Sequence, residues 1–120
     1  MKKGLFLVVM ALTLVMALGC AHTSSPGKQS PVLNKIQKEG VLKIGTAASM
    51  PPLNMKNKQG KVIGLEMDIA SAMAKSMDVE LEVVIKPFSE LLPALMAGEV
   101  DMVISGMTMT AGRNLDVAFA

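Results

Sequence analysis

The alternation of hydrophobic and polar positions divides the chain into three stretches. Residues 1–19 carry two lysines near the start and then an almost unbroken apolar run, whereas residues 20–31 are mostly polar. From residue 32 onward, short apolar runs alternate with segments in which apolar residues recur every three or four positions. Recurrence at that spacing is typical of helices that bury one face, and short apolar runs are typical of strands. Only the third stretch has the pattern of a folded domain.

The folded stretch contains three predicted helices and three predicted strands in alternating order. The helices span residues 32–39, 66–77 and 89–97, and the strands span residues 41–47, 79–85 and 101–105. A hairpin with its tip at residues 56–60 separates the first strand from the second helix, and Thr110 is placed to cap a last turn that runs through Arg113. Strands that alternate with helices favour an α/β fold with a parallel sheet and right-handed crossovers.

Individual positions within these elements carry more specific expectations. The apolar face of the second helix is predicted to contain five residues: Ile69, Ala70, Met73, Ala74 and Met77. The third helix is predicted to have Ser89 as its N-cap and Gly98 as its stop. Its inward side chains are predicted to be Leu91, Leu92, Leu95 and Met96. The strand at 101–105 is nearly continuous in apolar residues, which is typical of a strand buried on both faces.

The first stretch has the features of an export signal. Lys2 and Lys3 precede fourteen residues that are all apolar except Thr13, a run shorter than the ~20 residues of a membrane-spanning helix. Small residues then lead to Cys20, the single cysteine, in an arrangement that resembles a bacterial lipoprotein signal. We therefore predict a signal peptide at residues 1–19 and a lipid on Cys20 that holds the protein on a membrane. The alternative is an ordinary secretory signal, with Cys20 as an unmodified thiol that has no role in anchoring.

Residues 20–31 are predicted to form a flexible tether between the anchor and the domain, because they are polar and have almost nothing to bury. The one histidine, His22, lies in this tether without a second His, so no metal site is predicted there. Removal of residues 1–19 would leave equal numbers of basic and acidic residues. That balance argues against nucleic acid as a partner, and one cysteine excludes an intramolecular disulfide.

The candidate chemistry lies where predicted strands end, because ligands of open α/β sheets gather beyond the carboxyl ends of the strands. After the third strand, Ser105, Gly106 and Thr108 offer two hydroxyls and a closely approachable backbone. The only arginine, Arg113, follows. Its guanidinium is a planar fork that matches a carboxylate, and nearby N–H groups would complete an anion site. The alternative is a solvated Arg113 with Thr110 as a simple cap.

Two segments are similar to a known family. They are GLEMDIA at residues 64–70 and DMVISGMTMTAGR at residues 101–113, with VAF at 117–119 closing the match. They resemble the family 3 bacterial extracellular solute-binding proteins, the amino-acid-binding receptors of ABC importers, which also occur as sensor modules. The resemblance implies a type II periplasmic-binding-protein-like α/β fold, a parallel-type sheet with flanking helices. Residues 32–120 would form an incomplete first lobe of the two that such receptors have.

The resemblance also implies roles for individual residues. Arg113 would pair with the α-carboxylate of an amino acid or a related small carboxylate, with help from three residues: Thr108, Gly106 and Ser105. Met50 stands where the family usually has an aromatic residue that packs on the ligand side chain, and Ala47 lies near a position where members that bind polar amino acids often carry Asp. Both differences weaken the case for a cationic or strongly polar ligand, and a more apolar or a less selective ligand is the alternative.

Partners and location follow from the same resemblance. We expect a membrane permease as the partner, and a periplasmic or cell-surface location with the lipid anchor at Cys20. The family crosses into its second lobe just after the position of Phe119, so we expect a fragment or a truncated relative that binds ligand weakly by itself.

Two alternatives on the same fold are a sensor module and an enzyme, either a cyclic-acid dehydratase or a domain associated with a lytic transglycosylase. No catalytic residue and no cofactor is predicted, because no histidine is near the site and the nearest acids are placed on helix or strand ends rather than opposed across a cleft: Glu66, Asp68 and Asp101. Three methionines near the site could suggest Cu(I) ligands, but their spacing follows strand and helix faces and favours packing: Met102, Met107 and Met109.

Overall fold

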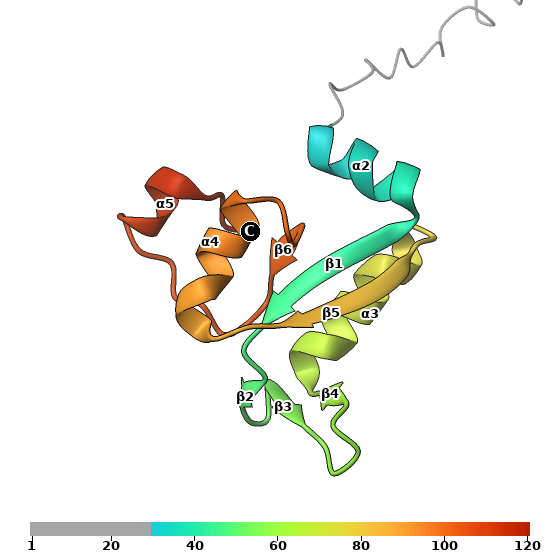
Figure 1. Cartoon of the computed structure of the whole chain (residues 1–120), viewed down its shortest axis with the longest axis vertical. Helices are drawn as coiled ribbons and strands as arrows, with labels where there is room; N and C mark the ends of the chain where they lie inside the picture. Colours follow the sequence, from blue (N-terminus) through green and yellow to red (C-terminus); the bar gives the residue numbers. More distant parts are fainter. Residues whose placement is uncertain (1–29) are drawn as a thin grey trace, which may run out of the picture.

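Residues 30–120 are described by the computed structural model, whose centre is a three-stranded parallel sheet in the order β5–β1–β6 (Figure 1). These strands are β1 (Val41–Thr46), β5 (Glu80–Ile85) and β6 (Met102–Val103). A small antiparallel sheet follows β1 and contains β2 (Ser49–Met50), β3 (Asn54–Lys56) and β4 (Val62–Ile63). The helices are α2 (Pro31–Glu39), α3 (Leu65–Ser76), α4 (Leu91–Met96) and α5 (Arg113–Asp116), with a 3-10 turn η1 (Phe88–Glu90) before α4. The predicted α/β class is confirmed.

The predicted signal peptide, Cys20 and the tether up to residue 29 lie outside the described residues. The first helix begins at Pro31, one residue earlier than predicted, and ends as predicted at Gly40, whose φ of 70° is the left-handed conformation that stops a helix. Across residues 30–120, no helix has the length and apolar character needed to cross a membrane.

The core lies between β1 and the helices α2 and α3. Leu42 and Ile44 point to this side of the sheet, where they meet Ile36 of α2 and two small residues of α3: Ala70 and Ala74. Ile44 is fully buried, as is expected of a central parallel strand. On the other face α4 approaches β1 at Gly45, where an added Cβ would lie 3.3 Å from Leu91 and from Val100.

Two helical faces and one cap differ from the predictions. The buried face of α3 contains positions 66, 70 and 74, and Ile69 is exposed instead of buried. The small side chains of Ala70 and Ala74 let the helix lie close against the sheet. Met96 is exposed because the six-residue α4 docks through Leu91 and Ala94. Ser89 makes no cap, since the chain enters α4 through the 3-10 turn that follows Pro87.

The last strand is shorter and less buried than predicted. Only Met102–Val103 pair with β1, and the side chains from 102 to 104 are half-buried rather than enclosed on both faces. Beside them is an open hollow of about 500 Å³ with mainly apolar walls, including Leu92, Leu95 and Phe119. β6 is an edge strand, and no described strand pairs with its outer edge (Figure 1), which is why β6 is less buried than predicted.

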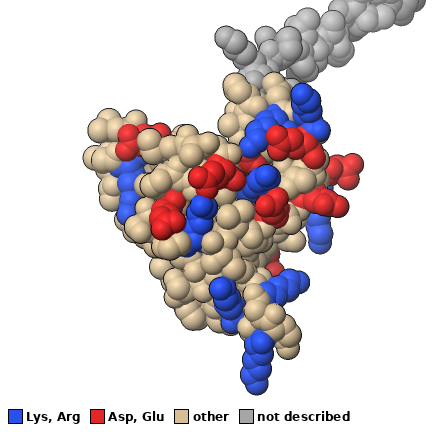
Figure 2. Space-filling view, in the orientation of Figure 1, with Lys and Arg blue, Asp and Glu red and all other residues tan. Residues whose placement is uncertain are grey.

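Charged side chains of both signs are interspersed over the face of the molecule seen in Figure 2. One of the ion pairs joins Lys86 to Glu99 at 2.6 Å. The hairpin between β3 and β4 has its tip at the predicted position. Asn57 organises this tip, because its side-chain oxygen accepts the N–H groups of Gln59 and Lys61.

Candidate functional site

The carboxyl ends of β1 and β6 bring two segments together, residues 46–50 and residues 105–108. The Ser105 hydroxyl accepts the Ala47 N–H at 2.9 Å and is buried, with 3% of the residue exposed. Ser105 therefore ties the two segments to each other. The hydroxyl keeps its O–H donor and a second lone pair after accepting this bond, but the burial of Ser105 limits direct contact between its side chain and a ligand.

A second connection passes through Glu66 in the first turn of α3. The Gly106 N–H donates to Oε1 of Glu66 at 2.7 Å, and the Asn54 side-chain amide donates to Oε2 at 2.6 Å. The Asn54 oxygen accepts the N–H groups of Ser49 at 2.9 Å and Met50 at 3.2 Å. Glu66 is 8% exposed and Asn54 is fully buried.

Neither Glu66 nor Asn54 is among the site residues predicted from sequence. The available signal was the position of Glu66 in the row 66, 70 and 74, whose other members are alanines facing the core. A carboxylate on a buried helix row requires hydrogen-bond donors nearby, so that row pointed to a polar connection.

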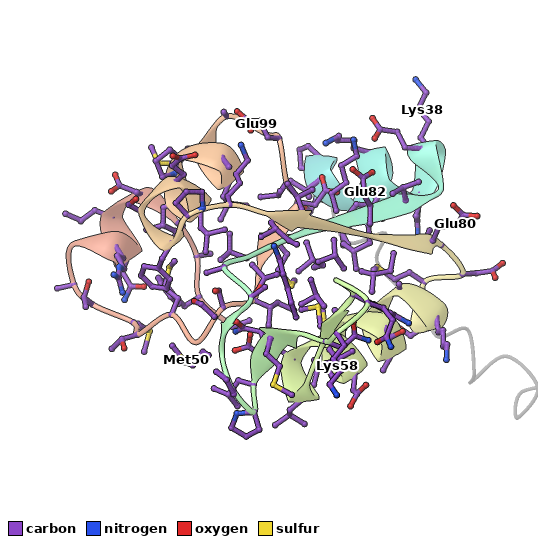
Figure 3. The ribbon with its side chains drawn as sticks, turned by 60° about the horizontal axis from the view of Figure 1, so that its bottom comes forward. Lys38, Met50, Lys58, Glu80, Glu82 and Glu99 are labelled. Carbon is purple, nitrogen blue, oxygen red and sulfur yellow. The ribbon has the colours of Figure 1, made fainter. Side chains whose placement is uncertain are left out.

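The structure places two predicted site residues, Met50 and Gly106, in direct contact. Gly106 has a φ of +58°, and a Cβ built there would lie 2.5 Å from the Met50 sulfur. The absence of a side chain at Gly106 thus makes room for Met50, which is itself 40% exposed. Figure 3 shows Met50 at the opposite end of the domain from Lys38 and Glu80.

Arg113 is held at the start of α5 by two contacts. Its Nη1 donates to the Thr108 carbonyl at 2.6 Å, and its guanidinium carbon lies 5.8 Å from the centre of the Phe88 ring. The Thr110 hydroxyl accepts the Arg113 N–H at 3.3 Å, which supports the predicted cap of this turn, although α5 itself starts after Gly112 without a side-chain cap. Among residues 30–120 no acidic side chain forms an ion pair with Arg113. Its remaining N–H donors are therefore not neutralised by a carboxylate of the described chain.

Phe88 was not predicted from sequence. It is partly exposed, precedes α4 and supports the Arg113 guanidinium, so it belongs to the same group of residues. The hollow beside β6 does not include Met50, Phe88 or Arg113 among its lining residues. Within the described part of the chain, no group of three or more His, Cys, Asp or Glu residues is placed to hold a metal ion.

The chain is similar to known proteins in both sequence and structure. The family model described as bacterial extracellular solute-binding proteins, family 3, matches residues 42–120. A probable histidine-binding protein of Campylobacter jejuni is 33% identical over 99% of this chain and 45% of its own length. The arginine-binding extracellular protein ArtP of Bacillus subtilis is 34% identical over the whole chain and 44% of its own length. This chain thus spans less than half the length of these two relatives.

A solved structure gives the same fold. Domain 1 of TmArgBP in its arginine-bound form has a TM-score of 0.70 and 36% sequence identity, over 72% of this chain and 68% of that domain. The resemblance seen in the sequence motifs is thus confirmed at the level of fold.

Proposed function

The chain belongs to the bacterial extracellular solute-binding proteins of family 3, and from that premise we propose that it binds an amino acid, or a related small carboxylate, for an ABC importer. The observation that carries the proposal is Arg113, a half-buried residue beyond the carboxyl end of β6 whose guanidinium has no acidic partner in the described chain. A planar fork in that position recognises a carboxylate through two parallel hydrogen bonds.

In this proposal Arg113 binds the ligand α-carboxylate, and the segment of Ser105, Gly106 and Thr108 supplies further polar contacts, among them the exposed Thr108 hydroxyl. The Thr108 carbonyl and the Phe88 ring hold the guanidinium in place, which lowers the entropy lost on binding. Met50 offers an apolar surface to the ligand side chain. The exposed part of Phe88 offers a second one.

The ligand is drawn from the amino acids, with histidine and arginine as the first candidates because relatives are named for them. Met50 and the neutral Ala47 favour a ligand with an apolar side chain instead. The arginine-bound domain 1 of TmArgBP supports binding by a single lobe. Weak binding by this chain alone stays a prediction.

We further propose a location outside the cytoplasmic membrane, with a lipid on Cys20 and the importer permease as the partner. The names of relatives support the location, since histidine-binding periplasmic proteins of Salmonella typhimurium and Escherichia coli match 90% and 65% of the chain. Mass spectrometry of the membrane fraction tests the anchor: the wild type should carry acyl mass on Cys20, and Cys20→Ser should not. An unmodified wild-type N-terminus would contradict it.

We propose no catalytic role. Glu66 and Asp101, the described acids with the least exposed carboxylates, use both oxygens in internal hydrogen bonds, which leaves neither as a free general acid or base. The relatives reported above are named as binding proteins.

Isothermal titration of the purified chain with a panel of amino acids tests the proposal. Histidine, arginine, glutamine and leucine separate cationic, polar and apolar side chains. Arg113→Ala should weaken binding of every ligand by about 100-fold or more, because a charged hydrogen-bonded pair is lost. Arg113→Lys keeps the charge but not the fork and should recover only part of the affinity. Equal affinity of the wild type and Arg113→Ala would refute the carboxylate role.

A further inference from the structure

Glu66 connects the two strand-end segments that carry proposed ligand contacts. Its Oε1 accepts the Gly106 N–H, and its Oε2 accepts the Asn54 amide. Through the Asn54 oxygen the connection continues to the N–H groups of Ser49 and Met50. One side chain of α3 is therefore joined to the segment after β6 directly and to the segment after β1 through a single buried amide.

We propose that Glu66 is a positioning residue of the ligand site, which sets the place of the Gly106 segment relative to the Met50 segment. It acts through Gly106 and Asn54 rather than through contact with the ligand. The proposal rests on the amino-acid-binding function proposed above, and it adds a residue that the resemblance did not assign to the site.

The hydrogen-bond directions require a carboxylate at this position. The Asn54 oxygen is occupied by two backbone N–H groups, which fixes its NH₂ group toward Glu66. Gly106 also presents an N–H donor to Glu66. Position 66 must therefore offer two acceptors and no donor, as an ionised carboxylate does. A glutamine at position 66 would turn its own NH₂ group toward one of these donors. Two donors would then face each other in a buried place without an acceptor.

Packing transmits a displacement of Gly106 to the rest of the site. The Met50 sulfur lies directly against the Gly106 backbone, so movement of Gly106 moves the apolar surface of Met50. Gly106 also leads within two residues to Thr108, whose carbonyl holds Arg113 at 2.6 Å. Loss of the Glu66 connection should disturb the carboxylate contact and the side-chain contact of the ligand together.

Glu66→Gln tests the proposal, with Asp68→Asn as the matched control. Asp68 lies in the same first turn of α3 and is exposed, so its substitution removes the same charge without touching the network. Titration with L-arginine and L-histidine should show affinity weakened roughly tenfold or more in Glu66→Gln and unchanged in Asp68→Asn. Wild-type affinity in Glu66→Gln would overturn the proposal.

A swap variant separates positioning from simple loss of stability. Asn54→Asp combined with Glu66→Gln keeps the net charge and reverses the donor and the acceptor between the two side chains. The new amide at position 66 would then donate to the new carboxylate at position 54 and accept from Gly106. That carboxylate would still accept the N–H groups of Ser49 and Met50. The swap should restore affinity to within about threefold of the wild type. A swap that restores the urea unfolding free energy but not the affinity would overturn the proposal.

Amide hydrogen exchange distinguishes failure of this inference from failure of the proposed function. If the wild type binds no amino acid of the panel, the proposed function fails, and the network is then judged by the exchange rates of the Gly106 and Met50 amides. Faster exchange of both amides in Glu66→Gln, with slow exchange recovered in the swap variant, would support Glu66 as the connecting group. Faster exchange at only one of the two amides would contradict it.

Discussion

Two buried carboxylates lie at opposite ends of the parallel sheet and have similar bonding. Asp101, at the amino end, accepts the Lys43 N–H at 3.0 Å and the Lys35 ammonium at 3.0 Å. Glu66, at the carboxyl end, accepts the Gly106 N–H and the Asn54 amide. Each carboxylate thus binds one backbone N–H and one side-chain donor from another element. The side chain of Asp101 is 3% exposed, and Glu66 is 8% exposed.

The difference between them is the charge of the side-chain partner. Asp101 has a cation, Lys35, which also donates to the Gly98 carbonyl at 3.4 Å and fixes α2 to the sheet. Glu66 has neutral donors alone among the described residues, so its charge is stabilised by dipoles. A carboxylate held only by neutral donors loses its hydrogen bonds when one donor is reversed, whereas an ion pair tolerates imperfect geometry. The comparison teaches that a similar hydrogen-bond arrangement serves stability at one end and positioning at the other.

Glycine substitutions should give the largest difference in unfolding free energy between the Glu66 end and the Asp101 end of the sheet. Gly64 precedes Glu66 with a φ of 128°, and a Cβ there would lie 2.3 Å from the Leu53 carbonyl oxygen. Gly64→Ala should lower the unfolding free energy by about 3 kcal/mol or more, because strain and overpacking each cost roughly 1–3 kcal/mol.

Gly98→Ala is the control at the Asp101 end. Gly98 has a φ of 75° but open space around the Cβ position, so the expected loss is about 1–2 kcal/mol from backbone strain alone. Urea unfolding of the wild type and of both variants measures these losses of unfolding free energy. Equal losses would mean that the tight entry into α3 is not what holds Glu66 in place.

Asp101→Asn should separate stability from binding. The substitution places an NH₂ group against either the Lys43 N–H or the Lys35 ammonium, which should lower the unfolding free energy by roughly 2–3 kcal/mol. Ligand affinity should stay at the wild-type value, in contrast to Glu66→Gln. A parallel loss of affinity would show that the amino end of the sheet is coupled to the site and would remove the distinction between the two carboxylates.

The sequence predicted the elements of this fold because their periodicity and helix stops are local properties. The parallel sheet, the stop at Gly40 and the cap at Thr110 all follow from spacing and residue type within a few positions. The orientation of α3 does not follow from local sequence, because Ile69 and Ala70 are both apolar. Only tertiary packing against β1 determines that the face with the alanines is the buried one. The exposed Met96 has a similar cause, because it depends on how the short α4 docks.

The candidate site could be predicted in part. Gly106 and Arg113 carry distinctive chemistry and lie in one segment, so their neighbourhood is visible in sequence. Glu66 lies 40 residues from Gly106 and 12 residues from Asn54, and a bond between distant residues has no local signature. Phe88 joins Arg113 across 25 positions for the same reason. The incomplete burial of β6 depends on what covers the sheet, which the strand's own residues do not specify.

Ser105→Ala should have a smaller effect that falls on the carboxyl end alone. Loss of the hydroxyl leaves the half-buried Ala47 N–H without its acceptor, so the unfolding free energy should fall by about 1 kcal/mol, with a modest loss of ligand affinity. Ser76→Ala is the control, since the Ser76 hydroxyl makes an exposed bond within its own helix. Wild-type affinity in Ser105→Ala would indicate that the Glu66 network alone holds the two segments in register.

Alkaline pH should give the smallest effect, and only at the Asp101 end. The hydrogen bond to Asp101, opposed by desolvation and aided by the charges of Asp101 and Glu39, raises the pKa of Lys35 above its usual value of 10.5. Because this pKa is higher in the folded chain, the stabilisation is fully present below about pH 10.5 and is lost as pH rises through the folded value.

The stability difference between the wild type and Lys35→Met should therefore shrink when thermal unfolding is followed from pH 9 to pH 12. Lys86, whose pKa is also raised by its bond to Glu99, is present in both proteins and cancels in the difference. The difference between the wild type and Glu66→Gln should stay constant over the same range, because the partners of Glu66 carry no titrating cation. If both stability differences shrink with rising pH, the pH change acts on the whole fold rather than on the Lys35–Asp101 pair.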